Sequence, residues 1–149
     1  IGDAYMCAGG LHGNTKDHAH RMVMAAFEIA ACVEEAKKDV AAKDLTFDIR
    51  IGINTGPVVA GVVGTKKFAY DIWGDTVNVA SRMESMSEPG RINISENTYA
   101  LIKDDADCEY RGEIQVKNRG MMKMYFVNNI TSDGLKIENN SVKTEIGRA

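Results

Sequence analysis

The sequence contains few of the residues that build disulfide-stabilised, membrane-spanning or rigid proline-rich proteins. Its 149 residues include only three cysteines and two prolines. Cys7, Cys32 and Cys108 lie far apart, without the spacing of a disulfide framework or a zinc site, so we expect reduced thiols in an intracellular protein. No apolar run approaches the ~18 residues that a bilayer requires, and no signal-peptide pattern is present.

An excess of basic charge is also absent. The sequence has 18 Lys and Arg residues against 21 Asp and Glu residues, which gives a net charge of −3. A mildly acidic domain is a poor candidate for binding nucleic acid or an anionic membrane. Its 44% hydrophobic and 26% charged residues are typical of a globular protein, and the length fits one domain.

The spacing of apolar residues at three and four positions predicts helices, the longest of them clearly amphipathic. Capping residues stand at their expected starts. We predict three helices. The first has about 25 residues, follows a cap at Asn14 or Thr15, has Asp17 in its first turn and ends near Val40. The second covers 77–86 with Asp75 or Thr76 as its cap, and the third is capped by Ser95 and ends near Lys103.

Alternating apolar residues bounded by turn residues predict short strands. The expected strands cover 47–53, 58–63, 68–73 and 92–94, with the end of another over 5–11 and a hairpin of 109–116 and 122–127 around the turn 117–120. Helices that alternate with short strand pairs are typical of an α+β fold in which helices cover a mixed or antiparallel sheet. The polar, patternless residues 129–149 are predicted to form a tail or linker after a domain over 1–128.

Two acidic residues are candidates for chemistry. Asp3 follows a glycine at a strand end, where a carboxylate can hold Mg²⁺ together with a second carboxylate and phosphate oxygens, or can simply cap a turn. Asp71 stands in a largely apolar strand on the same face as Trp73. Its carboxylate needs hydrogen-bond donors such as an adenine amine, unless it lies on an exposed strand edge.

Several polar and basic residues could bind a sugar or a phosphate. Asn78 and Arg82 are four residues apart, so they share one helix face, which is either a binding stripe or a solvated surface. Lys117 and Arg119 stand in the hairpin turn, and Arg50 faces away from Ile49 and Ile51; each is a phosphate contact or a solvated side chain. The histidines at positions 12, 18 and 20 form no convincing metal set.

Four segments in order resemble the catalytic domain of the class III nucleotide cyclases, the adenylyl and guanylyl cyclase family. They are 1–6 (IGDAYM), 51–58 (IGINTGPV), 68–83 (FAYDIWGDTVNVASRM) and 116–120 (VKNRG). The resemblance covers residues 1 to about 128 and implies a ferredoxin-like βαββαβ core with an added C-terminal hairpin. The family's first strand, a second metal-binding aspartate and a base-contacting lysine would precede Ile1, which leaves open whether the chain is active alone.

The resemblance also implies roles for individual residues. It implies a homodimer with active sites between two protomers, and two Mg²⁺ or Mn²⁺ ions that bind the nucleotide. The implied assignments are Asp3 for a metal, Arg50 and Lys117 for the triphosphate, Asp71 with its neighbour Ile72 for the base, Asn78 for the ribose and Arg82 for the transition state. Guanylyl cyclases usually carry Cys or a small residue at the position of Asp71, so the resemblance favours ATP and an adenylyl cyclase.

Two alternatives remain open at this point. The chain could be a guanylyl cyclase, or a non-catalytic module that senses nucleotides or forms dimers with the same fold. Domains of this family commonly follow sensor or membrane modules, so we expect a cytoplasmic catalytic domain whose parent protein has an upstream sensor or a membrane anchor.

Overall fold

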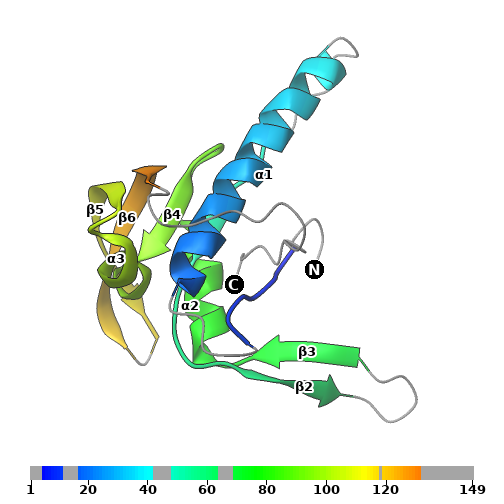
Figure 1. Cartoon of the computed structure of the whole chain (residues 1–149). Coiled ribbons are helices and arrows are strands. Elements are labelled where there is room, and N and C mark those ends of the chain that lie inside the picture. The colour runs from blue at the N-terminus through cyan, green and yellow to red at the C-terminus, as the bar shows by residue number, and fades with distance from the viewer. Residues whose placement is uncertain (1–4, 12–16, 42–47, 64–68, 118, 132–149) are drawn as a thin grey trace.

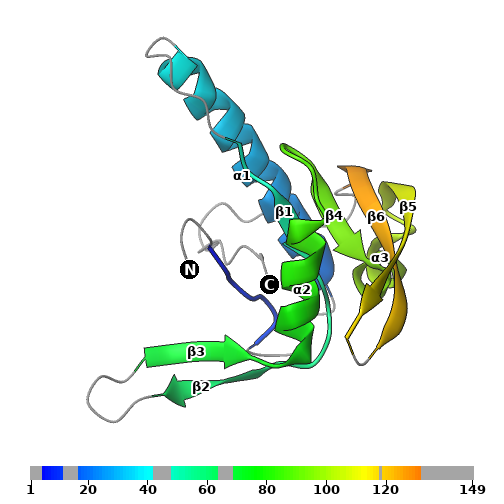
Figure 2. The ribbon, with the colours of Figure 1, turned by 180° about the vertical axis from the view of Figure 1, so that it is seen from behind.

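The computed structural model describes residues 5–11, 17–41, 48–63, 69–117 and 119–131. Its larger sheet has four strands in the order β1-β4-β6-β5 (Figures 1 and 2). The bounds are Ile51–Ile53 for β1, Ile92–Ser95 for β4, Ala106–Val116 for β5 and Gly120–Ile130 for β6. β1 and β4 are parallel and the other neighbours are antiparallel, so the mixed sheet of the predicted α+β fold is confirmed.

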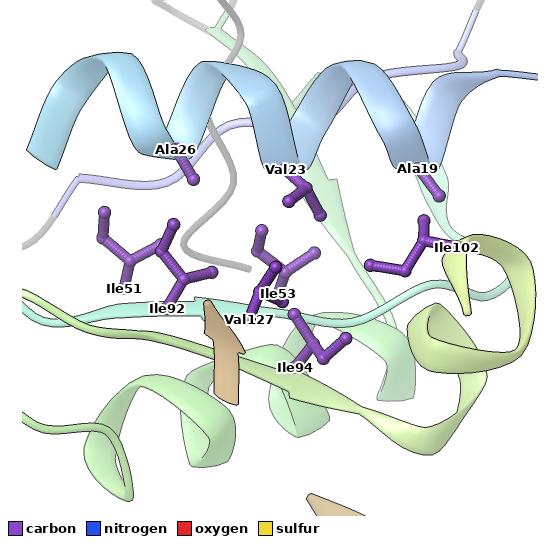
Figure 3. Close-up of a cluster of buried hydrophobic side chains, with 9 residues drawn as sticks. All are labelled: Ala19, Val23, Ala26, Ile51, Ile53, Ile92, Ile94, Ile102 and Val127. Atoms are coloured by element: carbon purple, nitrogen blue, oxygen red, sulfur yellow. The ribbon is translucent and has the colours of Figure 1, made fainter. Parts of the chain in front are cut away.

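One face of the sheet is covered by α1, His18–Ala41, the long amphipathic helix that the spacing predicts. Its buried residues Val23 and Ala26 lie over the isoleucines of β1 and β4 (Figure 3). The short helix α3, Glu96–Ile102, closes the same core with Ile102. As predicted, Ser95 caps α3: its hydroxyl accepts a hydrogen bond from the Thr98 amide at 3.4 Å.

The opposite face carries α2, Asp75–Ser85. Alternate residues of β4 point to the two sides of the sheet: Ile92 and Ile94 belong to the core under α1, whereas the Asn93 amide donates to the Met83 carbonyl of α2 at 2.9 Å. The second core consists of buried side chains from α2 and the β5–β6 hairpin, namely Val79, Met83, Ile114, Val116, Met122 and Met124.

The start of α2 differs from the prediction. The N-cap is Gly74, with no side-chain capping hydrogen bond, and neither Asp75 nor Thr76 takes that place. Gly74 has a φ of 130°, which glycine adopts readily. Both predicted caps are engaged elsewhere, because Asp75 pairs with Arg119 and the Thr76 hydroxyl donates to the Pro57 carbonyl at 2.5 Å.

A second, two-stranded sheet joins β1 to α2. Strands β2, Val59–Val63, and β3, Ala69–Trp73, pair antiparallel and project from the rest of the molecule (Figures 1 and 2). Asp71 stands opposite Gly61 in this pairing, and Ile72 opposite Ala60. Both strands were predicted, but the separate sheet was not.

Several strand boundaries differ from the predicted ones. Residues 5–11 carry no strand, because no described strand pairs with them. β1 begins only at Ile51, so Arg50 precedes the strand. β5 starts earlier than the predicted 109 and ends at Val116 as predicted, whereas β6 extends past both ends of the predicted 122–127. The reason is that backbone pairing runs from Ala106–Ile130 to Val116–Gly120.

Candidate functional site

The exposed face of α2 carries two of the predicted site residues. Asn78 and Arg82 are both exposed and lie one turn apart on this helix. Only Gly74 separates β3 from α2, so the strand position of Asp71 lies within seven residues of Asn78. The chain therefore brings an acidic strand position, an amide and a guanidinium into one continuous strand–helix unit.

The β5–β6 turn lies beside the first turn of α2. Arg119 in this turn forms an ion pair with Asp75, the first residue of the helix. Lys117, two residues earlier, is exposed. The Arg119–Asp75 pair therefore places the backbone of this turn, including Lys117, near the beginning of α2.

Arg50 lies at the other end of α2. Its guanidinium is 3.8 Å from the carboxylate of Glu84, whose side chain is only 10% exposed. Glu84 and Asp75 are nine positions apart in the helix, which corresponds to a rise of about 13.5 Å. One chain thus places Arg50 and Lys117 at opposite ends of the same helix, and does not bring the two predicted triphosphate contacts together.

Polar side chains anchor the loop after β1 to α2 and α3. The Asn54 amide donates to the Thr76 carbonyl at 3.1 Å, and its oxygen accepts a hydrogen bond from the Ser95 hydroxyl at 2.5 Å. A small cavity of about 70 Å³ lies between this loop, residues 6–9 and the starts of α1 and α2. Ligand pockets usually span ~300–1,000 Å³, so this cavity is too small for a nucleotide.

The predicted metal ligand Asp3 lies outside the described residues. Within the residues that the structure describes, no group of three or more His, Cys, Asp or Glu side chains could hold a metal ion. One carboxylate is also too small a donor set for two hard cations. The residues seen here do not by themselves form a metal centre, so the metal assignment stays a prediction.

Sequence reasoning missed the contacts of three residues that shape this region. Asn54 and Thr76 connect two loops to the start of α2, and Asp75 binds Arg119. The basic turn at Arg119 was a visible signal, but its partner is 44 residues away along the chain. None of the described helices has the length and apolar character to cross a membrane.

The molecule is thus an α+β domain with a mixed sheet, a projecting hairpin and a polar exposed helix face. The chain belongs to the adenylate and guanylate cyclase catalytic domain family, whose model matches residues 1–129.

Relatives of both catalytic types match the chain. It is 41% identical over 141 residues to adenylate cyclase type 9 of Gallus gallus, covering 91% of this chain and 11% of that protein. It is 41% identical over 128 residues to guanylate cyclase soluble subunit beta-2 of Rattus norvegicus, and this match covers 85% of this chain and 20% of that protein. The chain therefore spans only a small part of the curated relatives' length.

A solved structure supports the same fold. The guanylate cyclase domain of RhGC from Catenaria anguillulae, in complex with GTP, superposes with a TM-score of 0.73 at 38% identity. The match covers 83% of this chain and 66% of that one. The architecture expected from the resemblance is thus confirmed at the level of the fold.

Proposed function

We propose that the chain is the catalytic part of an adenylyl cyclase, which converts ATP to 3′,5′-cyclic AMP and pyrophosphate. The observation that carries this proposal is the strand–helix unit of β3 and α2. It presents Asn78 and Arg82 on one exposed helix face, directly after the strand position of Asp71. Membership of the cyclase family supports the same reading.

The reaction forms a bond between the ribose 3′-oxygen and the α-phosphorus, and it breaks the bond between the α-phosphorus and the oxygen that bridges it to the β-phosphorus. Pyrophosphate leaves with the bonding electrons, and the proton of the 3′-hydroxyl passes to solvent. In this proposal Asn78 orients the ribose, and Arg82 stabilises the negative charge that develops around the α-phosphorus. Arg50 and Lys117 hold the triphosphate. Two Mg²⁺ or Mn²⁺ ions, one of them bound through Asp3, would add positive charge to the phosphates.

We further propose that a homodimer forms the complete site. Arg50 and the turn of Lys117 lie at opposite ends of α2, and the cavity of about 70 Å³ beside the start of this helix is smaller than a nucleotide. A second copy in two-fold symmetry would set the Arg50 end of one protomer against the Lys117 end of its partner. The exposed positions of Asn78 and Arg82 support a site that a partner surface closes.

Asp71 is the basis for proposing ATP. A carboxylate accepts a hydrogen bond from the exocyclic amine of adenine, whereas guanine presents a carbonyl oxygen at the corresponding position, which repels it. Guanylyl cyclase remains the second candidate because guanylate cyclase soluble subunit beta-2 is as similar to this chain as adenylate cyclase type 9. In either case the chain would act as a cytoplasmic module of a longer protein with sensor or membrane domains.

The proposal is tested by measuring cyclic nucleotide formation from ATP and from GTP, with Mn²⁺, by the protein in its full natural length. We expect cyclic AMP and pyrophosphate in equal amounts, and a higher kcat/KM for ATP than for GTP. A preference for GTP would support the guanylyl alternative and overturn the role of Asp71. Nucleotide binding without either product would support a non-catalytic module.

The base preference gives a sharper prediction. Replacing Asp71 by cysteine removes the carboxylate that favours the adenine amine, so we expect the ratio of kcat/KM for ATP to that for GTP to fall at least about tenfold. The conservative variant Asp71→Glu keeps a carboxylate acceptor and should retain ATP as the better substrate. An unchanged ratio in Asp71→Cys would mean that another residue reads the base.

A further inference from the structure

The start of α2 is held by contacts from distant parts of the chain. Its N-cap glycine makes no side-chain hydrogen bond to the helix. The first helical residue, Asp75, instead pairs with Arg119, and the second, Thr76, receives the Asn54 amide on its carbonyl and donates its hydroxyl to the Pro57 carbonyl. The helix that carries Asn78 therefore takes its position from tertiary contacts on both sides.

Arg119 belongs to the same short connection as Lys117. Val116 and Gly120 pair at the end of the hairpin, and the Arg119 amide donates to the Val116 carbonyl at 3.0 Å. These contacts hold Arg119 close to the end of β5, where Lys117 directly follows Val116. An anchor on Arg119 consequently limits where the Lys117 backbone can lie relative to α2.

Among the described residues, none anchors the Lys117 side chain in a comparable way. It is exposed, and no described residue forms an ion pair with its ammonium. The Asp75–Arg119 pair is itself exposed, with side-chain exposures of 45% and 36%. Such pairs add little to folding stability because water screens them, so the effect of this pair on geometry should exceed its effect on stability.

We propose that Arg119 is a positioning residue, which acts through Asp75 to hold the turn carrying Lys117 against the start of α2. The inference rests on the proposed function, in which Lys117 binds the triphosphate. The pair sets the distance between this ammonium and Asn78, so that one bound nucleotide can reach both. Arg119 itself does not need to touch the substrate.

The test is a double-mutant cycle of Arg119→Gln and Asp75→Asn in the protein at its full natural length, assayed with ATP and Mn²⁺. We expect each single variant to raise KM about fivefold, the size that loss of one exposed ion pair allows, with kcat within about twofold. The KM of the double variant should also rise about fivefold, because either substitution alone already breaks the pair. Binding of 3′-deoxy-ATP, which lacks the attacking hydroxyl, should weaken by the same factor in a titration.

A merely structural role would lower the active fraction, and hence kcat, without raising KM. If KM rises fivefold in each single variant and about 25-fold in the double variant, Arg119 and Asp75 act independently and the inference is overturned. A raised KM in Arg119→Gln but not in Asp75→Asn would show that Arg119 contacts the nucleotide directly. In a Lys117→Ala background, Arg119→Gln should change KM no further, and an additional increase there would also contradict the inference.

Two controls keep these outcomes separate from folding and from the proposed function. Lys37→Gln breaks an exposed ion pair to Asp48 near the far end of α1 and should leave KM unchanged. Arg119→Lys keeps the charge and should restore most of the affinity. If the unmodified protein forms no cyclic nucleotide, the proposed function fails, whereas the titration with 3′-deoxy-ATP still decides whether Arg119 and Asp75 act together.

Discussion

Replacing Arg82 by alanine is expected to lower kcat for cyclic AMP formation by a factor on the order of 10²–10³. Arg82 is exposed on α2, one turn beyond Asn78, where its guanidinium can reach a phosphate held outside the helix. Charge on the α-phosphate oxygens grows in the transition state, so the loss should appear in kcat, with KM within about threefold. Steady-state kinetics with ATP and Mn²⁺ measure both.

Two variants make this result specific. Arg82→Lys keeps the charge but loses the planar fork of donors, so we expect it to recover only part of the activity. Ser81→Ala changes the exposed neighbour on the same helix and should retain full activity. If Arg82→Ala keeps more than a tenth of the original kcat and melts normally, Arg82 is not the transition-state residue.

Local signals predicted most of the elements. The apolar spacing of α1 and the alternation around Ile51 and Ile53 need only neighbouring residues, and they place the two layers that form the core under α1. The cap at Ser95 is equally local, because its hydroxyl meets an amide three residues away. Elements with a short-range cause were therefore predictable to within a few residues.

The contacts that shape the site are long-range, which is why they escaped prediction. Asn54 meets Ser95 across 41 residues, and Arg119 meets Asp75 across 44. The N-cap of α2 differs from the prediction for the same reason, because the side chains of Asp75 and Thr76 bind partners far away in the sequence. Residue types in a motif indicated which groups matter, and only the packed chain showed how they are held.

Arg50 illustrates the same point for assembly. Its pattern predicted a strand residue whose side chain contacts a phosphate or is solvated, yet Arg50 lies before β1 and its guanidinium is 3.8 Å from the nearly buried carboxylate of Glu84. A partner at the end of α2 can be found only when β1 and α2 lie against each other. In the proposed homodimer, the contact of Arg50 with a triphosphate would depend on the partner protomer, which spacing within one chain does not describe.

Replacing Gly52 by alanine is expected to destabilise the fold by about 3 kcal/mol or more, the upper end of what overpacking costs. Gly52 is buried in β1, and a Cβ there would collide with the Glu84 backbone nitrogen and lie 2.5 Å from the Met83 carbonyl carbon. Both atoms are backbone of α2, so no side chain can rotate away. For a domain of this size we expect the Tm to fall by about 6–12 °C.

The same collision should displace α2 and disturb the residues it carries. Because the hydrogen bond from Asn93 to the Met83 carbonyl and the Asn78–Arg82 face move with the helix, Gly52→Ala should also lose most cyclase activity below its Tm. Gly9→Ala is the matched control: its nearest atom is the flexible Met22 methyl at 3.0 Å, and its Tm should stay within about 2 °C of the unmodified protein. Thermal unfolding followed by circular dichroism compares the two glycines directly. Equal Tm values for Gly52→Ala and Gly9→Ala would contradict the direct packing of α2 on β1.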